Sequence, residues 1–209
     1  GDEISGVRAV QVAMANIDPT KLSGTVIGIT GSNPNAISRT TRNWLISTDG
    51  GETSNFNRLF PGKKDGIAPE QHAFLIWNML LKGNADYVLD VHTQSTGTVF
   101  PFFVYADYRD PAIQRLAELM PADQIKKDPG EKGSFETAMV EAKIPAITME
   151  IGNPRAFDPD MIARANEGFH NVMVDLKMVN GKIGRTAETT NAYIGNDLKN
   201  IRAEQGGYA

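Results

Sequence analysis

Three segments of the chain are apolar over nearly their whole length and predict buried β-strands. They are 86–92 (DYVLDVH), 100–106 (FPFFVYA) and 145–152 (PAITMEIG). A fourth run, 24–30 (GTVIGIT), is β-branched and bounded by glycines, which also favours a strand. Strands that are apolar throughout, rather than strands in which apolar and polar residues alternate, are typical of sheets that are covered on both faces.

Amphipathic segments separate these runs and predict helices. Asp110-Pro111 and Asp158-Pro159 each place an N-cap residue before a first-turn proline, and Ser134 is a third candidate N-cap. The expected helices are 6–16, a segment from Pro69 to Lys82-Gly83, one beginning at Pro111, 134–143, and a long one beginning at Pro159. The sequence therefore predicts an α/β fold with a central β-sheet flanked by helices on both faces.

Composition narrows the class of protein. The 209 residues, 41% hydrophobic and 22% charged, suffice for one sizeable globular domain. A net charge of −4 argues against a nucleic-acid partner, because no basic surplus is present to neutralise phosphates. Apolar stretches are too short to predict a membrane span. Without cysteine there are no disulfides or thiolate metal ligands. The compartment stays undetermined, leaning cytoplasmic, and self-association into a homo-oligomer is left open.

The ends of two predicted strands carry side chains able to do chemistry. DYVLDVH ends in Asp90 and His92, and PAITME ends in Glu150. Asp90 and His92 point to the same face, because side chains alternate along a strand. In open α/β sheets, ligands gather beyond the carboxyl ends of the strands. Each residue alone would be explained by a structural role, but their shared edge favours a functional site.

A polar loop, 32–62, offers a second set of candidates. It holds arginines and asparagines with few hydrophobic residues between them. Arginine can hold a carboxylate through two parallel hydrogen bonds. Asn57 and Arg58 lie between Phe56 and Phe60, which anchor them, so we interpret this pair as functional.

Five segments in order carry a family resemblance: GDE at the start, SNP with a following arginine, NFNRLFPG, LDVHTQSTG and ITMEIG. The chain resembles the succinylglutamate desuccinylase/aspartoacylase family, within the zinc carboxypeptidase superfamily. The resemblance extends from Gly1 to about Met178. It implies a mixed central sheet of the zinc carboxypeptidase kind.

The resemblance also implies a metal site for one Zn²⁺ ion. In the family motif His-Gly-x-Glu, the histidine and the glutamate bind zinc. Gly1 and Glu3 match its second and fourth positions, so the motif's histidine is expected immediately before Gly1. His92 matches the last protein ligand. Three such ligands leave one position for water, as in catalytic zinc sites.

The remaining roles follow from the same resemblance. Glu150 is the candidate general base, and Arg42 would stabilise the oxyanion of the tetrahedral intermediate. Asn57 and Arg58 would hold a carboxylate of the substrate. The chain departs from the family at Asn55, where an acidic residue is common. A further substrate-binding arginine of some members has no counterpart, since Glu136 and Glu141 occupy that region.

The function implied is a zinc-dependent hydrolase that cleaves the amide bond of a small anionic N-acyl substrate, such as an N-acylated amino acid. Two alternatives stay open: a metallocarboxypeptidase acting on peptides, and a carboxylate-binding relative without catalysis. We expect a catalytic domain at 1–180. The polar segment 181–209 is expected to be a connector towards a C-terminal β domain outside this chain.

Overall fold

A five-stranded mixed sheet forms the centre of the molecule. The computed structural model describes residues 1–47, 51–95 and 100–196. The strand order is β3-β6-β4-β5-β7. β6 is antiparallel to β4, and the other neighbouring pairs are parallel. The bounds are β3 Val88–His92, β4 Phe102–Ala106, β5 Gln124–Lys127, β6 Ala146–Ile151 and β7 Tyr193–Gly195.

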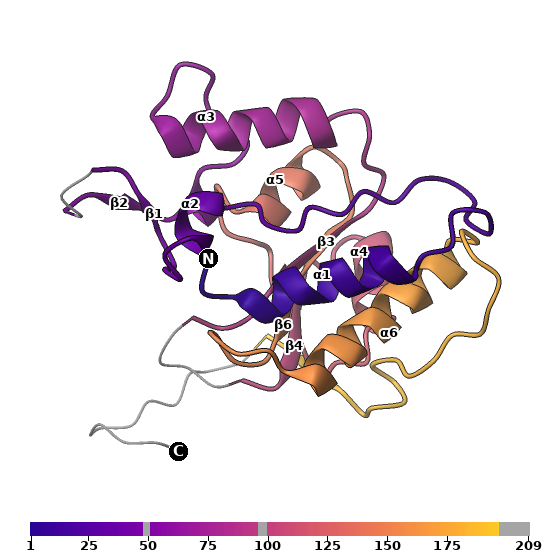
Figure 1. The fold of residues 1–209 in the computed structure, drawn as a ribbon. Coiled ribbons are helices and arrows are strands. Elements are labelled where there is room, and N and C mark those ends of the chain that lie inside the picture. Colours follow the sequence, from indigo (N-terminus) through magenta and orange to yellow (C-terminus); the bar gives the residue numbers. More distant parts are fainter. Residues whose placement is uncertain (48–50, 96–99, 197–209) are drawn as a thin grey trace, which may run out of the picture.

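Helices cover both faces of this sheet (Figure 1), which confirms the predicted α/β class. One face packs against α1 (Ile4–Asn16), α4 (Pro111–Glu118) and α6 (Pro159–Asp175), of which α1 and α6 lie side by side. The other face packs against α5 (Phe135–Glu141). Beyond α5 lies α3 (Ala68–Leu75), continued by the π-helix η2 (Ile76–Leu81). No helix in the described ranges is both long and apolar enough to cross a bilayer.

The helix starts confirm the predicted caps. The Asp110 side chain accepts a hydrogen bond from the Ala112 N–H, and the Asp158 side chain accepts one from the Met161 N–H. Ser134 Oγ accepts one from the Thr137 N–H. Each bond satisfies a backbone donor that has no partner within its own helix. Local sequence therefore determines where these three helices begin.

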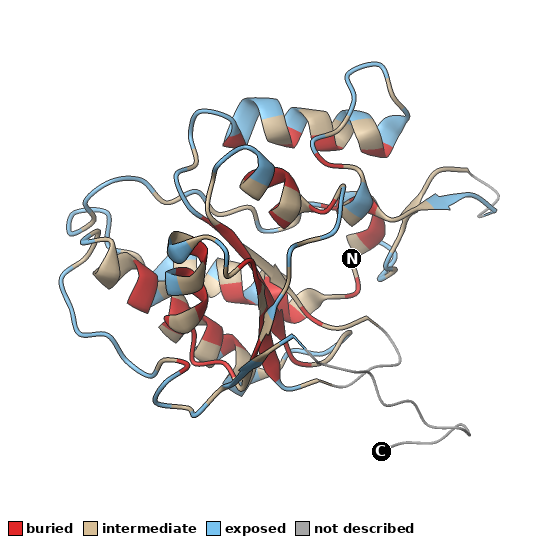
Figure 2. Ribbon diagram, turned by 180° about the vertical axis from the view of Figure 1, so that it is seen from behind, coloured by how far each residue is buried: buried red, intermediate tan, exposed pale blue. Residues whose placement is uncertain are grey.

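Two hydrophobic cores lie on opposite faces of the sheet, and the buried residues concentrate along its central strands (Figure 2). The larger core joins α4 and α6 to side chains such as Val104 and Met149. The smaller one joins Val88 and Ala146 to Met139 of α5. Apolar residues on both sides of each strand explain why β3, β4 and β6 read as continuous hydrophobic runs.

The strand predicted at 24–30 is wrong. These residues are irregular in the structure and pair with no strand of the described chain, and Ile27 is exposed. β-branched composition favours extended backbone, but a strand also requires a neighbour to share its hydrogen bonds. In its described residues, 32–47 and 51–66, the predicted loop carries short elements: α2 (Pro34–Ile37), β1 (Trp44–Leu45), β2 (Thr53–Ser54) and the 3₁₀ turn η1 (Phe56–Arg58).

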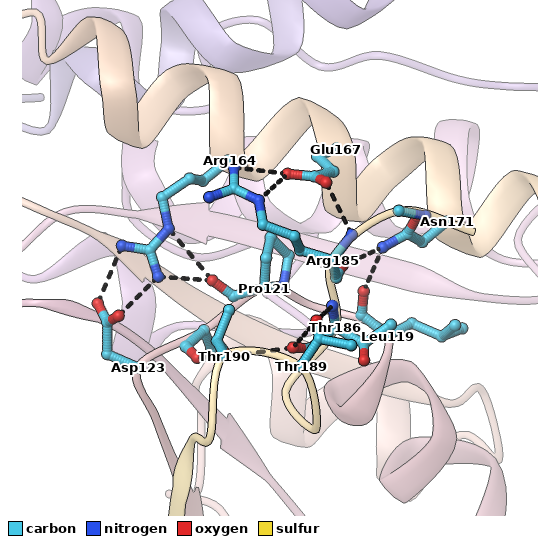
Figure 3. Close-up of polar contacts among 12 residues, drawn as sticks. Leu119, Pro121, Asp123, Arg164, Glu167, Asn171, Arg185, Thr186, Thr189 and Thr190 are labelled. Carbon is cyan, nitrogen blue, oxygen red and sulfur yellow. Dashed lines mark hydrogen bonds and ion pairs between the residues drawn. The ribbon is translucent and has the colours of Figure 1, made fainter. Parts of the chain in front are cut away.

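Residues 184–195 pack onto the domain through a polar network (Figure 3). Asn171, fully buried in α6, donates to the Leu119 and Arg185 carbonyls and accepts from the Gly184 N–H. Arg185 pairs with Glu167 at 2.7 Å. β7 then joins the sheet beside β5. The domain boundary at residue 180 and the connector stay predictions, and residues 197–209 lie outside the described residues.

Replacing Asn171 with alanine should destabilise the protein. The variant leaves the Leu119 and Arg185 carbonyls and the Gly184 N–H without their amide partner. Unsatisfied buried polar groups cost about 1–3 kcal/mol, so we expect a loss of that order in the free energy of unfolding in urea. The control is Asn78→Ala, whose exposed amide donates to Phe74 one helical turn away. Equal stability of the two variants would contradict a stabilising role for this network.

Candidate active site

The parallel pairing of β3 and β6 brings the predicted strand-end residues together. His92 lies opposite Glu150, and Asp90 lies opposite Thr148. β4 extends both rows, with Phe103 opposite Glu150 and Tyr105 opposite Thr148. Because alternate side chains share a face, we define two adjacent rows: an outer row, His92–Glu150–Phe103, and an inner row, Asp90–Thr148–Tyr105.

Glu3 is the N-cap residue of α1, yet its side chain caps no N–H of that helix in the described structure. Its Oε2 instead lies 2.7 Å from His92 Nδ1 and accepts a hydrogen bond from the Thr93 N–H at 3.3 Å. Gly6 makes this approach feasible, since a Cβ there would lie 2.6 Å from the Val91 carbonyl oxygen of β3. Glu3 is therefore part of the site rather than an ordinary helix-start carboxylate.

His92 is held between two carboxylates. Its Nε2 lies 2.9 Å from Asp90 Oδ2, and its Nδ1 faces Glu3. Burial lowers the pKa of His92, but Asp90 and Glu3 outweigh it and hold that pKa well above the ordinary value. With Asp90 accepting the Nε2 proton, the other nitrogen can act as a metal ligand, as in carboxylate–histidine–zinc arrangements.

Glu150 is 9% exposed, and its Oε2 has no hydrogen-bond partner within the described ranges. Burial raises its pKa to about 8; His92 opposes this rise, whereas Glu3 adds to it. A buried carboxylate with a free oxygen can take up and return a proton.

Arg42 reaches the same place from the loop before β1. Its guanidinium lies 3.4 Å from Glu3 Oε1 and also contacts Ser95 Oγ. Its side chain is 45% exposed, so the cation lies at the mouth of the site. A guanidinium there can face a developing negative charge.

Asn57 and Arg58 come from the turn η1. Asn57 Oδ1 accepts a 2.7 Å hydrogen bond from the Phe135 N–H at the start of α5, which leaves its amide NH₂ as a donor. Arg58 pairs with Glu131 at 2.5 Å. Gly133 allows this contact between loops, because a Cβ there would lie 2.4 Å from the Arg58 carbonyl oxygen and its φ is +86°.

One cavity of about 830 Å³ is lined by all six predicted site residues. They are Glu3, Arg42, Asn57, Arg58, His92 and Glu150. The structure thus brings them together from five separate segments of the chain. Whether each has its predicted role stays a prediction.

The donors for a metal ion are incomplete in the described part of the chain. Glu3 Oε2 and His92 Nδ1, an oxygen and a nitrogen donor of the kinds that zinc takes, come from separate segments and lie within hydrogen-bond distance at 2.7 Å. No group of three His, Cys, Asp or Glu residues suited to a metal ion occurs within the described ranges. The residues present therefore fit two positions of a zinc site.

The structure adds to the sequence prediction at two residues. The spacing of Asp90 and His92 predicted a shared face, and the structure adds their direct contact. Glu136, in the first turn of α5, was not among the predicted site residues. In the structure it is 5% exposed and lines the cavity. The sequence does not show which side of α5 is buried, so it could not identify Glu136 as a residue of the site.

Comparison with known protein families agrees with the fold. Residues 1–176 match the succinylglutamate desuccinylase/aspartoacylase catalytic domain. The chain therefore belongs to this family of deacylases, which confirms the resemblance in the sequence.

Individual relatives extend the comparison. A protein named N-alpha-acetyl-L-2,4-diaminobutyric acid deacetylase, from Halomonas elongata, is 27% identical over 190 residues, which cover 88% of this chain and 54% of that protein. A succinylglutamate desuccinylase structure from Silicibacter sp. TM1040 has a TM-score of 0.79 at 22% identity, covering 98% of this chain and 62% of that one.

The product-bound ectoine utilization protein EutE (DoeB) from Ruegeria pomeroyi has a TM-score of 0.77 at 25% identity and covers 93% of this chain and 58% of that one. The chain thus spans between half and two thirds of the length of these relatives.

Glu136 should give the stability of this protein a distinctive pH dependence. Burial raises its pKa to about 8; Asp90, Asp128 and Asp107 add to the rise, and the Thr148 hydrogen bond opposes it. The folded state therefore retains a proton that the unfolded chain releases near pH 4.5. Stability should fall as the pH rises from there to about 8.

Glu136→Gln should remove the part of this fall that Glu136 causes, so that the variant gains on the order of a few kcal/mol in free energy of unfolding over the wild type between pH 5 and pH 8.5. Glu150, whose pKa is also raised to about 8, leaves a similar fall in both proteins. Urea unfolding at several pH values measures it. Glu141→Gln, an exposed position on the same helix, is the control. Parallel pH profiles for the wild type and Glu136→Gln would show that folding does not raise the pKa of Glu136.

Proposed function

We propose that this chain contributes the catalytic domain of a zinc-dependent amidohydrolase that removes the acyl group from an N-acylated amino acid or a similar small carboxylate. The observation that carries the proposal is the cluster at the carboxyl ends of β3 and β6. There the Glu3 carboxylate meets His92, and Glu150 lies opposite His92 in the next strand. Family membership and the Halomonas elongata relative, named as a deacetylase, support the reaction class.

Glu3 and His92 would hold the zinc ion. Such an ion supplies a Lewis acid and a water of lowered pKa. Asp90 holds the His92 ring in position through Nε2, so that Nδ1 stays directed at Glu3. This chain thereby fixes two donors from separate segments with little remaining freedom.

Glu150 has the position and the chemistry of the general base. Its free Oε2 lies in the cavity wall beside His92, in a buried setting where a carboxylate can accept a proton from water. Returning that proton to the leaving amine nitrogen completes cleavage of the amide bond.

Arg42 and the Asn57–Arg58 pair would bind the negative charges of the oxyanion and of the substrate carboxylate. The Arg42 guanidinium, beside Glu3, can stabilise the oxyanion that forms on the acyl carbonyl. The Asn57 amide NH₂ and the Arg58 guanidinium would hold the substrate carboxylate. Arg58 would exchange its ion pair with the exposed Glu131 for that carboxylate. Holding the substrate in this way positions the scissile bond and accounts for a large share of catalysis.

Glu150→Gln in the full-length protein should lower kcat for N-acyl amino acids by about 10²–10⁴-fold. The amide cannot accept the proton, whereas the zinc donors Glu3 and His92 are unchanged, so bound zinc should stay at the wild-type level. Turnover assays and metal analysis measure the two effects. Glu188→Gln, an exposed glutamate, is the control. Full activity of Glu150→Gln, or a wild-type protein without zinc, would contradict the proposal.

Arg58→Ala should raise KM for N-acyl amino acids about 10–100-fold with a smaller change in kcat, because a charge-assisted hydrogen bond is worth about 1.5–3 kcal/mol. Glu131→Gln is the matched control: it removes the ion-pair partner of Arg58, so KM should stay the same or fall. An unchanged KM in Arg58→Ala would exclude this carboxylate site. Faster cleavage of short peptides than of N-acyl amino acids would favour a metallocarboxypeptidase instead.

A further inference from the structure

The turn that follows β6 is attached to the first residues of the chain by hydrogen bonds. The Arg155 N–H donates to the Asp2 carbonyl at 2.8 Å. Ser5, a fully buried residue of α1, donates from Oγ to the Ala156 carbonyl at 2.7 Å. Glu3 lies between Asp2 and Ser5 in the sequence, so these two bonds fix the segment of Glu3 relative to the end of β6.

The Arg155 side chain reaches a further segment, the loop that carries Arg42. Its Nη2 donates to the Thr40 carbonyl at 3.2 Å, two residues before Arg42. Arg155 and Arg42 also line the same small cavity of about 260 Å³. Arg155 therefore contacts both segments that meet at the mouth of the site, and it does so from the turn after the strand that carries Glu150.

The residues at both ends of this side-chain contact have a strained backbone. The angle φ is +56° at Arg155 and +52° at Thr40, in the left-handed region that residues with a side chain rarely adopt. Thr40 is also β-branched, which makes the conformation more costly for it. Such conformations persist where the surrounding contacts enforce them, and they are concentrated at functional sites. A hydrogen bond between two strained residues therefore indicates a geometric requirement of the site.

Arg42 needs a fixed backbone to do what the proposed function asks of it. Its side chain is 45% exposed, and its guanidinium contacts Glu3 Oε1 at 3.4 Å and Ser95 Oγ. A donor stabilises an oxyanion well only when it is held in advance at the place where the charge forms. A long side chain on an exposed loop meets this condition when the loop itself is anchored, and Arg155 supplies an anchor two residues away.

We propose that Arg155 is a positioning residue for catalysis, whose guanidinium anchors the Arg42 loop to the end of β6 and keeps the Arg42 guanidinium directed at the oxyanion. The inference rests on the proposed function and adds one residue to it. Arg155 acts through Arg42 rather than on the substrate. Since Glu150 belongs to β6, the anchor also keeps the general base and the oxyanion donor in one arrangement. The oxyanion forms only during the reaction, so loss of the anchor lowers kcat and leaves KM nearly unchanged.

Arg155→Ala in the full-length zinc-loaded protein should lower kcat for N-acyl amino acids about 10–100-fold, because small displacements of a catalytic group have effects of this size. KM should stay within about 2-fold of the wild type. The matched control is Arg39→Ala, which removes an exposed guanidinium that donates to the Asn35 carbonyl, and it should keep the wild-type kcat. A raised KM at unchanged kcat would show that Arg155 binds the substrate directly and would overturn the inference.

A double-mutant cycle separates positioning of Arg42 from a general loss of structure. If Arg155 acts through Arg42, Arg155→Ala should lower kcat much less in an Arg42→Ala background than in the wild type. An effect of the same factor in both backgrounds would mean that Arg155 acts independently of Arg42, and this result would overturn the inference.

Hydrogen–deuterium exchange tests the anchor without any turnover. The Thr40 N–H donates to the Ile37 carbonyl, so its exchange reports on the order of the loop. Arg155→Ala should speed exchange in residues 37–42, whereas exchange in α6 should stay at the wild-type rate. This result supports the anchor even if the wild type cleaves no N-acyl amino acid, a finding that would count against the proposed function alone. Unchanged exchange in residues 37–42 would overturn the inference.

Discussion

The contact between Glu3 and His92 is the interaction on which the site depends. It joins the first turn of α1 to the end of β3, two segments 89 residues apart in the sequence. Asp90 holds the other side of the imidazole ring. With both ring nitrogens engaged, the ring cannot rotate without losing a charged contact. The remaining groups are then positioned by ordinary sheet geometry, because the pairing of β3 with β6 places Glu150 opposite His92.

Charge distribution separates the cavity into two regions. At its mouth, Arg42 and Arg58 are partly exposed and paired with Glu3 and Glu131, so an incoming anion can compete for them. Deeper in, Glu136 and Glu150 are buried and their pKa values are raised to about 8. Burying unneutralised acids lowers stability, and such costs are typical of functional sites.

The site lies on one face of a sheet whose other face packs against α1, α4 and α6. The core on that other face buries side chains such as Val104 and Met149, and Asn171 of α6 attaches residues 184–185 to it through three hydrogen bonds. On the site face, α5 packs against β3 and β6, and the loops approach closely at Gly133. The larger apolar core and the buried acids Glu136 and Glu150 thus lie on opposite faces of the sheet.

Helix starts and buried strands of this protein could be predicted from its sequence, because both depend on residues close together in the chain. Ser134, Asp110 and Asp158 start helices through contacts a few residues away, and the apolar runs at β3, β4 and β6 indicate strands buried on both faces. The ordered segments with Glu3, His92 and Glu150 identified the family. Tertiary structure decided the rest: residues 24–30 form no strand, since pairing requires a neighbour that local sequence does not specify. The structure also places Glu136 in the cavity wall, which the sequence did not predict, since burial is a property of the packed chain.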